Sequence, residues 1–185
     1  MQSFKIEGGH KLKGEIFPQG AKNEALQILC AVLLTPEPVT ISNLPDIIDV
    51  NKLIDLLAGM GVKTQRKGPG SFRFQADDVN LNYFKTEEFR QKGGALRGST
   101  MILGPLLARF GTAALPKPGG DKIGRRRMDT HFIGFESLGA TFHYDSKSAF
   151  FEARAENGLK GTHMLLDEAS VTGTANIVMA ACLAE

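Results

Sequence analysis

Residues 116–128 hold the densest cluster of glycine and arginine in the sequence, reading Pro-Lys-Pro-Gly-Gly-Asp-Lys-Ile-Gly-Arg-Arg-Arg-Met. Gly119 and Gly120 let backbone N–H groups approach a ligand, and arginine side chains pair with phosphate or carboxylate oxygens. The loop therefore suits a phosphorylated or carboxylated small molecule. The alternative is a turn followed by a solvated basic patch, and neither a Walker motif nor a dinucleotide fingerprint is present.

Four further residues could act on such an anion. Asp121 lies between the glycines and the arginines, where a carboxyl group can serve as a general acid or base, or simply as a turn residue. Lys22 and Asn23 open one apolar segment, and Arg97 opens another at the equivalent position. Helix N-termini favour anions, and a cation there adds to the preference; the alternative is an ordinary surface charge.

The start of the next predicted helix carries Asp129, Thr130 and His131, where Asp129 could be only an N-cap. The other histidines, His10, His143 and His163, are scattered along the chain and indicate no metal site.

An internal repeat places these residues. Apolar segments begin at Lys22, Arg97 and Thr172, at equal intervals of 75 residues. Their small and apolar composition predicts helices buried on most sides, with a kink at Pro105 in the second copy.

The pattern after each segment also repeats. Strands are predicted at 39–41 and 113–115, and hairpins at 62–76 and 140–154. Helices are predicted at 49–59 and 129–138, and each ends at a glycine, Gly61 or Gly139, that suits a C-cap. The strand-to-helix step from Pro45 to Asn51 is 6 residues, whereas the matching step from Pro116 to Asp129 is 13. Extra loop length on a repeated scaffold marks a candidate site.

The composition describes an ordinary globular chain, with 185 residues, 42% apolar and 23% charged. A net charge of +2 argues against a generic polyanion binder. Cys30 and Cys182 are predicted to be core thiols in a reducing compartment. Without a signal segment or a long apolar stretch, the chain is predicted to be cytoplasmic.

Several motifs together resemble one enzyme family, the UDP-N-acetylglucosamine 1-carboxyvinyltransferases, and the resemblance runs along the entire chain. The motifs are Gly20-Ala21-Lys22-Asn23, Leu96-Arg97-Gly-Ser99, Pro118-Gly-Gly-Asp-Lys-Ile-Gly124, Asp129-Thr-His131, Leu138-Gly-Ala140 and Ser170-Val171.

The resemblance implies an α/β (α+β) fold, an inside-out α/β barrel domain built from βαβαββ-type repeats with helices on the inside. It implies that residues 1–21 are N-terminal strands belonging to a second domain. Residues 22–185 would then be most of the first domain, divided into units 22–96 and 97–171 and a truncated third unit, 172–185.

The implied activity transfers the enolpyruvyl group of phosphoenolpyruvate to the 3′-hydroxyl of UDP-N-acetylglucosamine and releases phosphate. No metal or organic cofactor, nucleic acid or membrane is implied. The general base and a further phosphate-binding arginine are expected in a missing C-terminal domain of the same chain, so the fragment alone is expected to be inactive.

The resemblance also assigns roles to residues. Lys22 would bind phosphoenolpyruvate with help from Asn23, Arg97 and Arg126 would be cleft arginines, and Asp121 would be the general acid that protonates the methylene carbon. The uridine-diphosphate pocket would be formed by Arg126, Arg127, Met128, Asp129, Thr130, His131, Ser170, Val171 and Thr172.

Two positions depart from the family pattern. Most members have cysteine at the position of Asp121, and fosfomycin alkylates that thiol. Since a carboxylate is a poorer nucleophile toward an epoxide, the sequence predicts resistance to fosfomycin. Arg127 stands where proline is common, which adds charge to the loop.

Three other functions stay open. The sister enzyme that transfers enolpyruvyl to shikimate 3-phosphate shares the fold and reaction type. Residues 125–127 could bind nucleic acid, although the loop has no interleaved aromatic residues. The chain could also be a non-catalytic ligand-binding domain.

Overall fold

A computed structural model describes residues 3–119 and 127–185 of the chain. Its α-helices are α1 (Lys22–Ala31), α2 (Ile48–Gly59), α3 (Glu87–Gly94), α4 (Leu103–Phe110), α5 (Asp129–Ser137) and α6 (Val171–Ala181). Short 3₁₀ helices are η1 (Val32–Leu34), η2 (Leu81–Lys85) and η3 (Arg97–Ile102). The strands are β1 (Val39–Ile41), β2 (Lys63–Gly68), β3 (Ser71–Gln75), β4 (Thr112–Pro116), β5 (Thr141–Asp145) and β6 (Phe150–Arg154).

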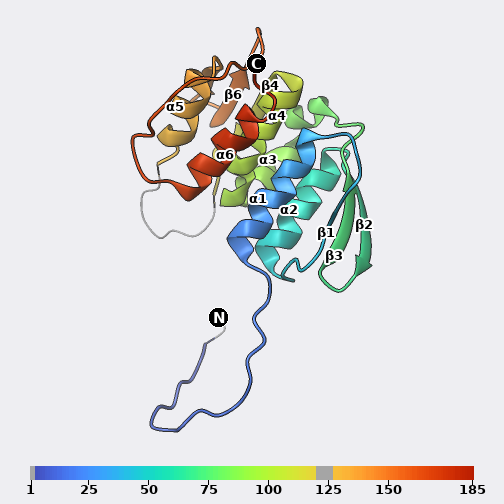
Figure 1. The fold of residues 1–185 in the computed structure, drawn as a ribbon, viewed down its shortest axis with the longest axis vertical. Helices are drawn as coiled ribbons and strands as arrows, with labels where there is room; N and C mark the ends of the chain where they lie inside the picture. The colour runs from blue at the N-terminus through green and yellow to red at the C-terminus, as the bar shows by residue number, and fades with distance from the viewer. Residues whose placement is uncertain (1–2, 120–126) are drawn as a thin grey trace.

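The strands form two antiparallel sheets of the same design, with strand orders β1-β3-β2 and β4-β6-β5. In each, the hairpin of the unit is joined by the strand that precedes the unit's second helix. Both units thus show a helix–strand–helix–strand–strand sequence, which confirms the predicted repeat and the α/β fold class (Figure 1).

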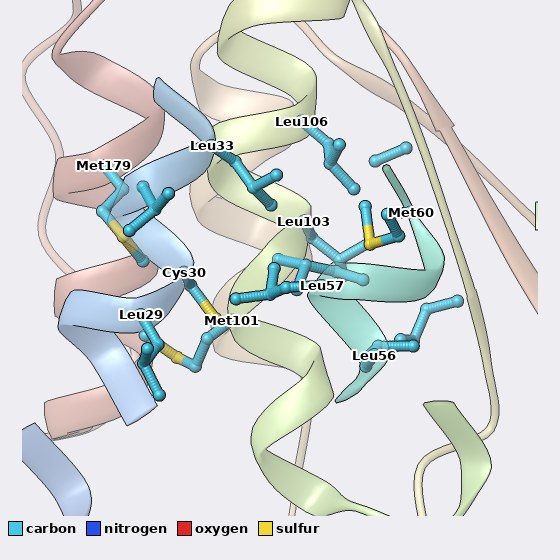
Figure 2. Close-up of a cluster of buried hydrophobic side chains, with 14 of the residues drawn as sticks. Leu29, Cys30, Leu33, Leu56, Leu57, Met60, Met101, Leu103, Leu106 and Met179 are labelled. Atoms are coloured by element: carbon cyan, nitrogen blue, oxygen red, sulfur yellow. The ribbon is translucent and has the colours of Figure 1, made fainter. Parts of the chain in front are cut away.

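Apolar side chains from the helices fill the centre of the molecule. α4 packs against α6 and against the 3₁₀ helix η1, and its Leu103, Leu106 and Leu107 are fully or almost fully buried. Figure 2 shows how the helices contribute to one cluster, whose labelled members are Leu29, Cys30, Leu33, Leu56, Leu57, Met60, Met101, Leu103, Leu106 and Met179. Burial of this apolar surface is the main force holding the helices together.

The helix ends follow the predicted glycines. Gly61 and Gly139 have φ angles of +98° and +96°, a left-handed conformation that residues with a Cβ adopt at a cost. The kink predicted at Pro105 takes another form, because the segment is a 3₁₀ helix up to Ile102 and an α-helix from Leu103. Pro105 thereby falls in the first turn of α4, where proline is tolerated.

Two predictions about burial are wrong in part. Cys30 is a core thiol, but Cys182 is exposed at the C-terminal end of α6. Burial on most sides holds only for the 97–110 segment, since Ile28 on α1 and Val178 on α6 are exposed. α1 and α6 each keep one side exposed to solvent, whereas residues 103–107 of α4 are buried on all sides.

Residues 3–21 contain no helix or strand and extend away from the helices (Figure 1). Their apolar side chains, including Phe4, Leu12 and Phe17, are exposed. The predicted strands are therefore not formed in this structure, and the assignment of residues 1–21 to a second domain stays a prediction.

The two units are joined by one side chain in particular. The Arg109 guanidinium on α4 donates hydrogen bonds from Nη1 to the carbonyl oxygens of Leu33 and Ala76, at 3.1 and 2.7 Å. Both carbonyls belong to the first unit.

In the described part of the chain, no helix is long and apolar enough to cross a membrane.

Candidate functional site

A cavity of about 360 Å³ lies where five helices begin, α1, α2, η3, α5 and α6. Its lining includes Lys22 and Asn23 at the start of α1, Arg97 at the start of η3, His131 in the first turn of α5 and Thr172 in the first turn of α6. These five residues were predicted from the sequence to bind substrate, and the fold brings them together. Helix N-termini carry partial positive charge, so their convergence favours an anion.

The charged residues that line the cavity also favour an anion. Among the described residues that line it, Lys22, Lys52 and Arg97 are cations and Asp49 is the one carboxylate. The Lys22 ammonium lies 3.0 Å from Asp49 Oδ2, and both side chains are roughly half exposed. Such a pair contributes little to stability, so an incoming anion can compete for Lys22 at small cost.

The Arg97 side chain is held in place by a hydrogen bond to the backbone of Arg127. Its Nη2 donates a hydrogen bond to the carbonyl oxygen of Arg127 at 3.1 Å. The side chain is half buried and comes from the first residue of η3. The backbone just before α5 therefore fixes where this guanidinium lies.

His131 is a neutral imidazole in this environment. Its side chain is buried, with 5% of the residue exposed, and burial together with the positive charge of Arg97 lowers its pKa from 6.5 to about 4. Nδ1 lies 3.1 Å from the side-chain nitrogen of Asn176 on α6. His131 therefore lines the cavity without adding charge to it.

The Arg127 side chain binds carboxylates of the chain itself. Its Nε lies 2.9 Å from Asp129 Oδ2 and its Nη2 lies 2.8 Å from Asp167 Oδ2, and these acidic partners raise its pKa. The Thr130 hydroxyl is within hydrogen-bond distance of carboxylates of Asp167 and Glu168. These contacts tie the start of α5 to the segment before α6.

The other predicted site residues that the structure describes do not line this cavity. Met128 is the residue before α5, so Asp129 is the first helical residue and not its N-cap. Ser170 caps α6, because its Oγ accepts a hydrogen bond from the Gly173 N–H at 3.1 Å. Val171 is exposed. Asp121 and Arg126 lie outside the described residues.

Sequence reasoning missed Asp49, Lys52 and Thr100, which line the cavity, and Asn176, which lies behind it. Asp49 and Lys52 stand in the first turns of α2, which is the counterpart of α5 in the repeat. Since residues at the start of α5 were predicted to bind substrate, the same position in α2 could have been examined for polar residues. Asn176 is a lone amide in an otherwise apolar helix, and such a residue needs buried partners. Within residues 3–119 and 127–185, no three His, Cys, Asp or Glu side chains gather as metal ligands would.

Three curated relatives of the chain share one name. The UDP-N-acetylglucosamine 1-carboxyvinyltransferases of Bacteroides fragilis and Porphyromonas gingivalis are each 61% identical to the chain over 185 residues, and that of Borreliella burgdorferi is 43% identical. Each match covers 100% of this chain but 42% of the relative, so the chain spans about two fifths of their length.

Solved structures show the same fold at low identity. The enolpyruvyl transferase NikO from Streptomyces tendae matches with a TM-score of 0.77 and 19% identity, over 96% of this chain and 40% of that one. EPSP synthase from Acinetobacter baumannii matches with a TM-score of 0.68 and 16% identity, over 93% and 38% of the two chains. A family model described as EPSP synthase (3-phosphoshikimate 1-carboxyvinyltransferase) matches residues 6–185, and the chain therefore belongs to that family.

Proposed function

We propose that the protein to which this chain belongs transfers the enolpyruvyl group of phosphoenolpyruvate to the 3′-hydroxyl of UDP-N-acetylglucosamine and releases phosphate. The observation that carries the proposal is the cavity where the first turns of five helices meet and which Lys22 and Arg97 line. The names of the relatives, at up to 61% identity, support the sugar nucleotide as acceptor.

The chemistry needs fixed positive charge. The 3′-hydroxyl gives its proton to the general base expected in the C-terminal domain as its oxygen bonds to C2 of phosphoenolpyruvate, and C3 takes a proton from the general acid. The product is a tetrahedral adduct that still carries phosphate and carboxylate. Loss of a proton from C3 and of phosphate from C2 then restores the double bond. Fixed cations at the positions of Lys22 and Arg97 stabilise the anionic adduct through both steps.

In this proposal Lys22, Asn23, Arg97 and Arg126 hold phosphoenolpyruvate, and Asp121 delivers the proton to C3. The uridine-diphosphate part lies along the start of α5 and α6, bounded by residues 126–131 and 170–172. The reaction would begin peptidoglycan precursor synthesis in the cytoplasm.

Acceptor choice tests the function. The assay uses a protein that contains this chain and has the full length of its relatives. With phosphoenolpyruvate it is expected to release phosphate when UDP-N-acetylglucosamine is added, and not when shikimate 3-phosphate is added. Arg97→Ala is expected to lower kcat/KM by at least about a hundredfold, the scale of losing one preorganised group that stabilises the adduct. Arg73→Ala, an exposed arginine on β3, is the matched control and is expected to have normal kinetics. Release that depends on shikimate 3-phosphate instead would show that the proposed acceptor is wrong.

Fosfomycin response tests the role of Asp121. The wild-type protein is expected to keep its activity in the presence of the drug, because a carboxylate reacts slowly with an epoxide. Asp121→Cys is expected to become sensitive and to gain one covalent adduct on the 116–128 loop, measured by mass spectrometry. A wild-type protein inactivated with one adduct on this loop would contradict the role.

A further inference from the structure

Asn176 on α6 joins three helical segments from a fully buried position, with 0% of the residue exposed. Its Nδ2 donates a hydrogen bond to the carbonyl oxygen of Thr100 at 2.9 Å, and its Oδ1 accepts one from the Gly104 N–H at 2.9 Å. Nδ2 also lies 3.1 Å from His131 Nδ1. Every polar atom of this amide therefore has a partner.

The two backbone contacts fix which way the amide faces. In a regular α-helix the N–H of residue 104 would donate to the carbonyl of residue 100, so the amide bridges one donor–acceptor pair at the junction of η3 and α4. Turning the amide over would set oxygen against the Thr100 carbonyl and an NH₂ group against the Gly104 N–H. Both hydrogen bonds would be lost in a buried site, at the cost of two unsatisfied pairs.

This orientation determines the protonation of His131. An amide NH₂ only donates, so His131 Nδ1 must accept and cannot carry a proton. The proton of the neutral ring is therefore on Nε2. Asn176 lies on α6, which has no charged side chain within Val171–Ala181, and Arg97 on η3 adds positive charge near the ring. The Asn176 amide and the charge of Arg97 therefore both oppose protonation of His131 Nδ1, which would give the ring a positive charge.

Nε2 is the nitrogen that remains available to a ligand. It makes no hydrogen bond within the described part of the chain. Among the described residues, Tyr83 Oη is the one fully buried side-chain nitrogen or oxygen that lacks a hydrogen bond, so Nε2 is not fully buried. Nε2 is consequently accessible, and His131 lines the cavity described above.

We propose that Asn176 is a positioning residue: it holds His131 in the Nε2–H tautomer, so that the ring donates a hydrogen bond to an oxygen of the sugar nucleotide in the cavity. The inference rests on the proposed function for the identity of the ligand. It assigns Asn176 no contact with substrate, and it gives His131 the role of a neutral donor in place of a cation.

The tautomer can be measured without ligand. In long-range ¹H–¹⁵N spectra of the uniformly ¹⁵N-labelled chain at neutral pH, the His131 resonances are identified by their loss in His131→Gln. Nδ1 is expected to be unprotonated and Nε2 protonated. Asn176→Asp places a carboxylate against the ring, so Nδ1 is expected to gain a proton, whereas Ile177→Val at the next position should change nothing.

A protonated Nδ1 in the wild-type chain would overturn the proposal. An unchanged tautomer in a folded Asn176→Asp variant would overturn it equally. If that variant does not fold, the wild-type spectrum decides alone.

Binding of UDP-N-acetylglucosamine tests the donor role. Titration is expected to shift the His131 Nε2–H signal. His131→Gln, which keeps an acceptor for Asn176 and a donor for the cavity, is expected to keep the affinity, whereas His131→Phe should lose about tenfold. Asn176→Ala frees the ring and should weaken binding several-fold, with Ile177→Val unchanged.

The two proposals fail differently. If no resonance of the chain moves with UDP-N-acetylglucosamine, the proposed ligand is wrong while the tautomer result still judges the role of Asn176. If signals of Arg97 and Thr172 move and Nε2–H does not, the ligand is right and the donor role is wrong.

Discussion

At the scale of single residues, His131 couples stability to pH. Its pKa of about 4 in the folded chain lies below the ordinary value of 6.5, so between these pH values the unfolded chain binds a proton that the folded chain does not. Stability is therefore full above about pH 6.5 and falls as the pH drops toward 4. The free energy of unfolding is expected to decrease by about 3 kcal/mol over that range through this group alone.

The check is urea unfolding of wild type and His131→Gln from pH 7 to pH 4. Carboxylates titrate in both proteins, so the difference between the two curves isolates the histidine. Parallel curves would mean that His131 is not held neutral by its surroundings.

The sequence was informative about residues that share a repeat position or a motif. Lys22, Arg97 and Thr172 were found because the 75-residue register aligned three helix starts, and His131 because it belongs to a family motif. Asn176 was not found, since its partners are 45 to 76 residues away and only the tertiary fold brings them together. The ion pair between Arg127 and Asp167 was missed for the same reason, because 40 residues separate the two side chains.

At the scale of elements, α4 and α6 approach so closely that one position must be glycine. A Cβ at Gly104 would fall inside van der Waals contact with the backbone oxygen of Asn176, and backbone atoms cannot move aside as a flexible side chain can. Gly104→Ala is expected to destabilise the chain by about 3 kcal/mol, even though alanine favours a helix over glycine.

Gly94→Ala is the matched control for this prediction. Gly94 ends α3, and a Cβ there would make only ordinary contact, 3.9 Å from the Lys117 carbonyl oxygen. Its melting temperature is expected to stay near the wild-type value or rise slightly. Equal melting temperatures for the two variants would contradict the close packing of α4 on α6.

Most elements of the two units could be predicted, because strands and helices of regular period recur in both copies. The helix α3 and the 3₁₀ turn η2 were missed, since this connection in the first unit has no counterpart helix in the second. The sequence of α3 is mostly polar and ends in Gly93 and Gly94, so it lacks the apolar spacing by which a helix is recognised. Thr86 followed by Glu87 and Glu88 was the available signal, and Thr86 Oγ1 does cap α3.

At the scale of the whole molecule, the two cysteines report on opening of the core. Cys182 is exposed, whereas Cys30 lies inside the central cluster, where burial raises the pKa of its thiol and so suppresses the reactive thiolate. A thiol reagent is expected to label one cysteine quickly in the native chain and the second only as fast as the fold opens. Mass spectrometry of peptides over time measures both rates, and rapid native labelling of Cys30 would contradict the packing in Figure 2.

The repeat also made the overall architecture predictable, since two copies with the same strand order imply the same sheet twice. What the repeat could not reveal is how far each copy is enclosed. Residues 3–21 and the open sides of α1 and α6 have apolar side chains in contact with solvent, and local sequence does not determine what covers such side chains.

The Arg109 bridge has a consequence for how this chain unfolds. Two carbonyls of the first unit receive their hydrogen bonds from a guanidinium that only the second unit provides. Separating the units would leave those two carbonyls and the guanidinium without these hydrogen bonds, so a state with one unit folded and the other melted has little to stabilise it. Despite its repeated design, the chain should therefore melt in a single cooperative transition, unlike a solenoid, whose repeats can unfold one after another.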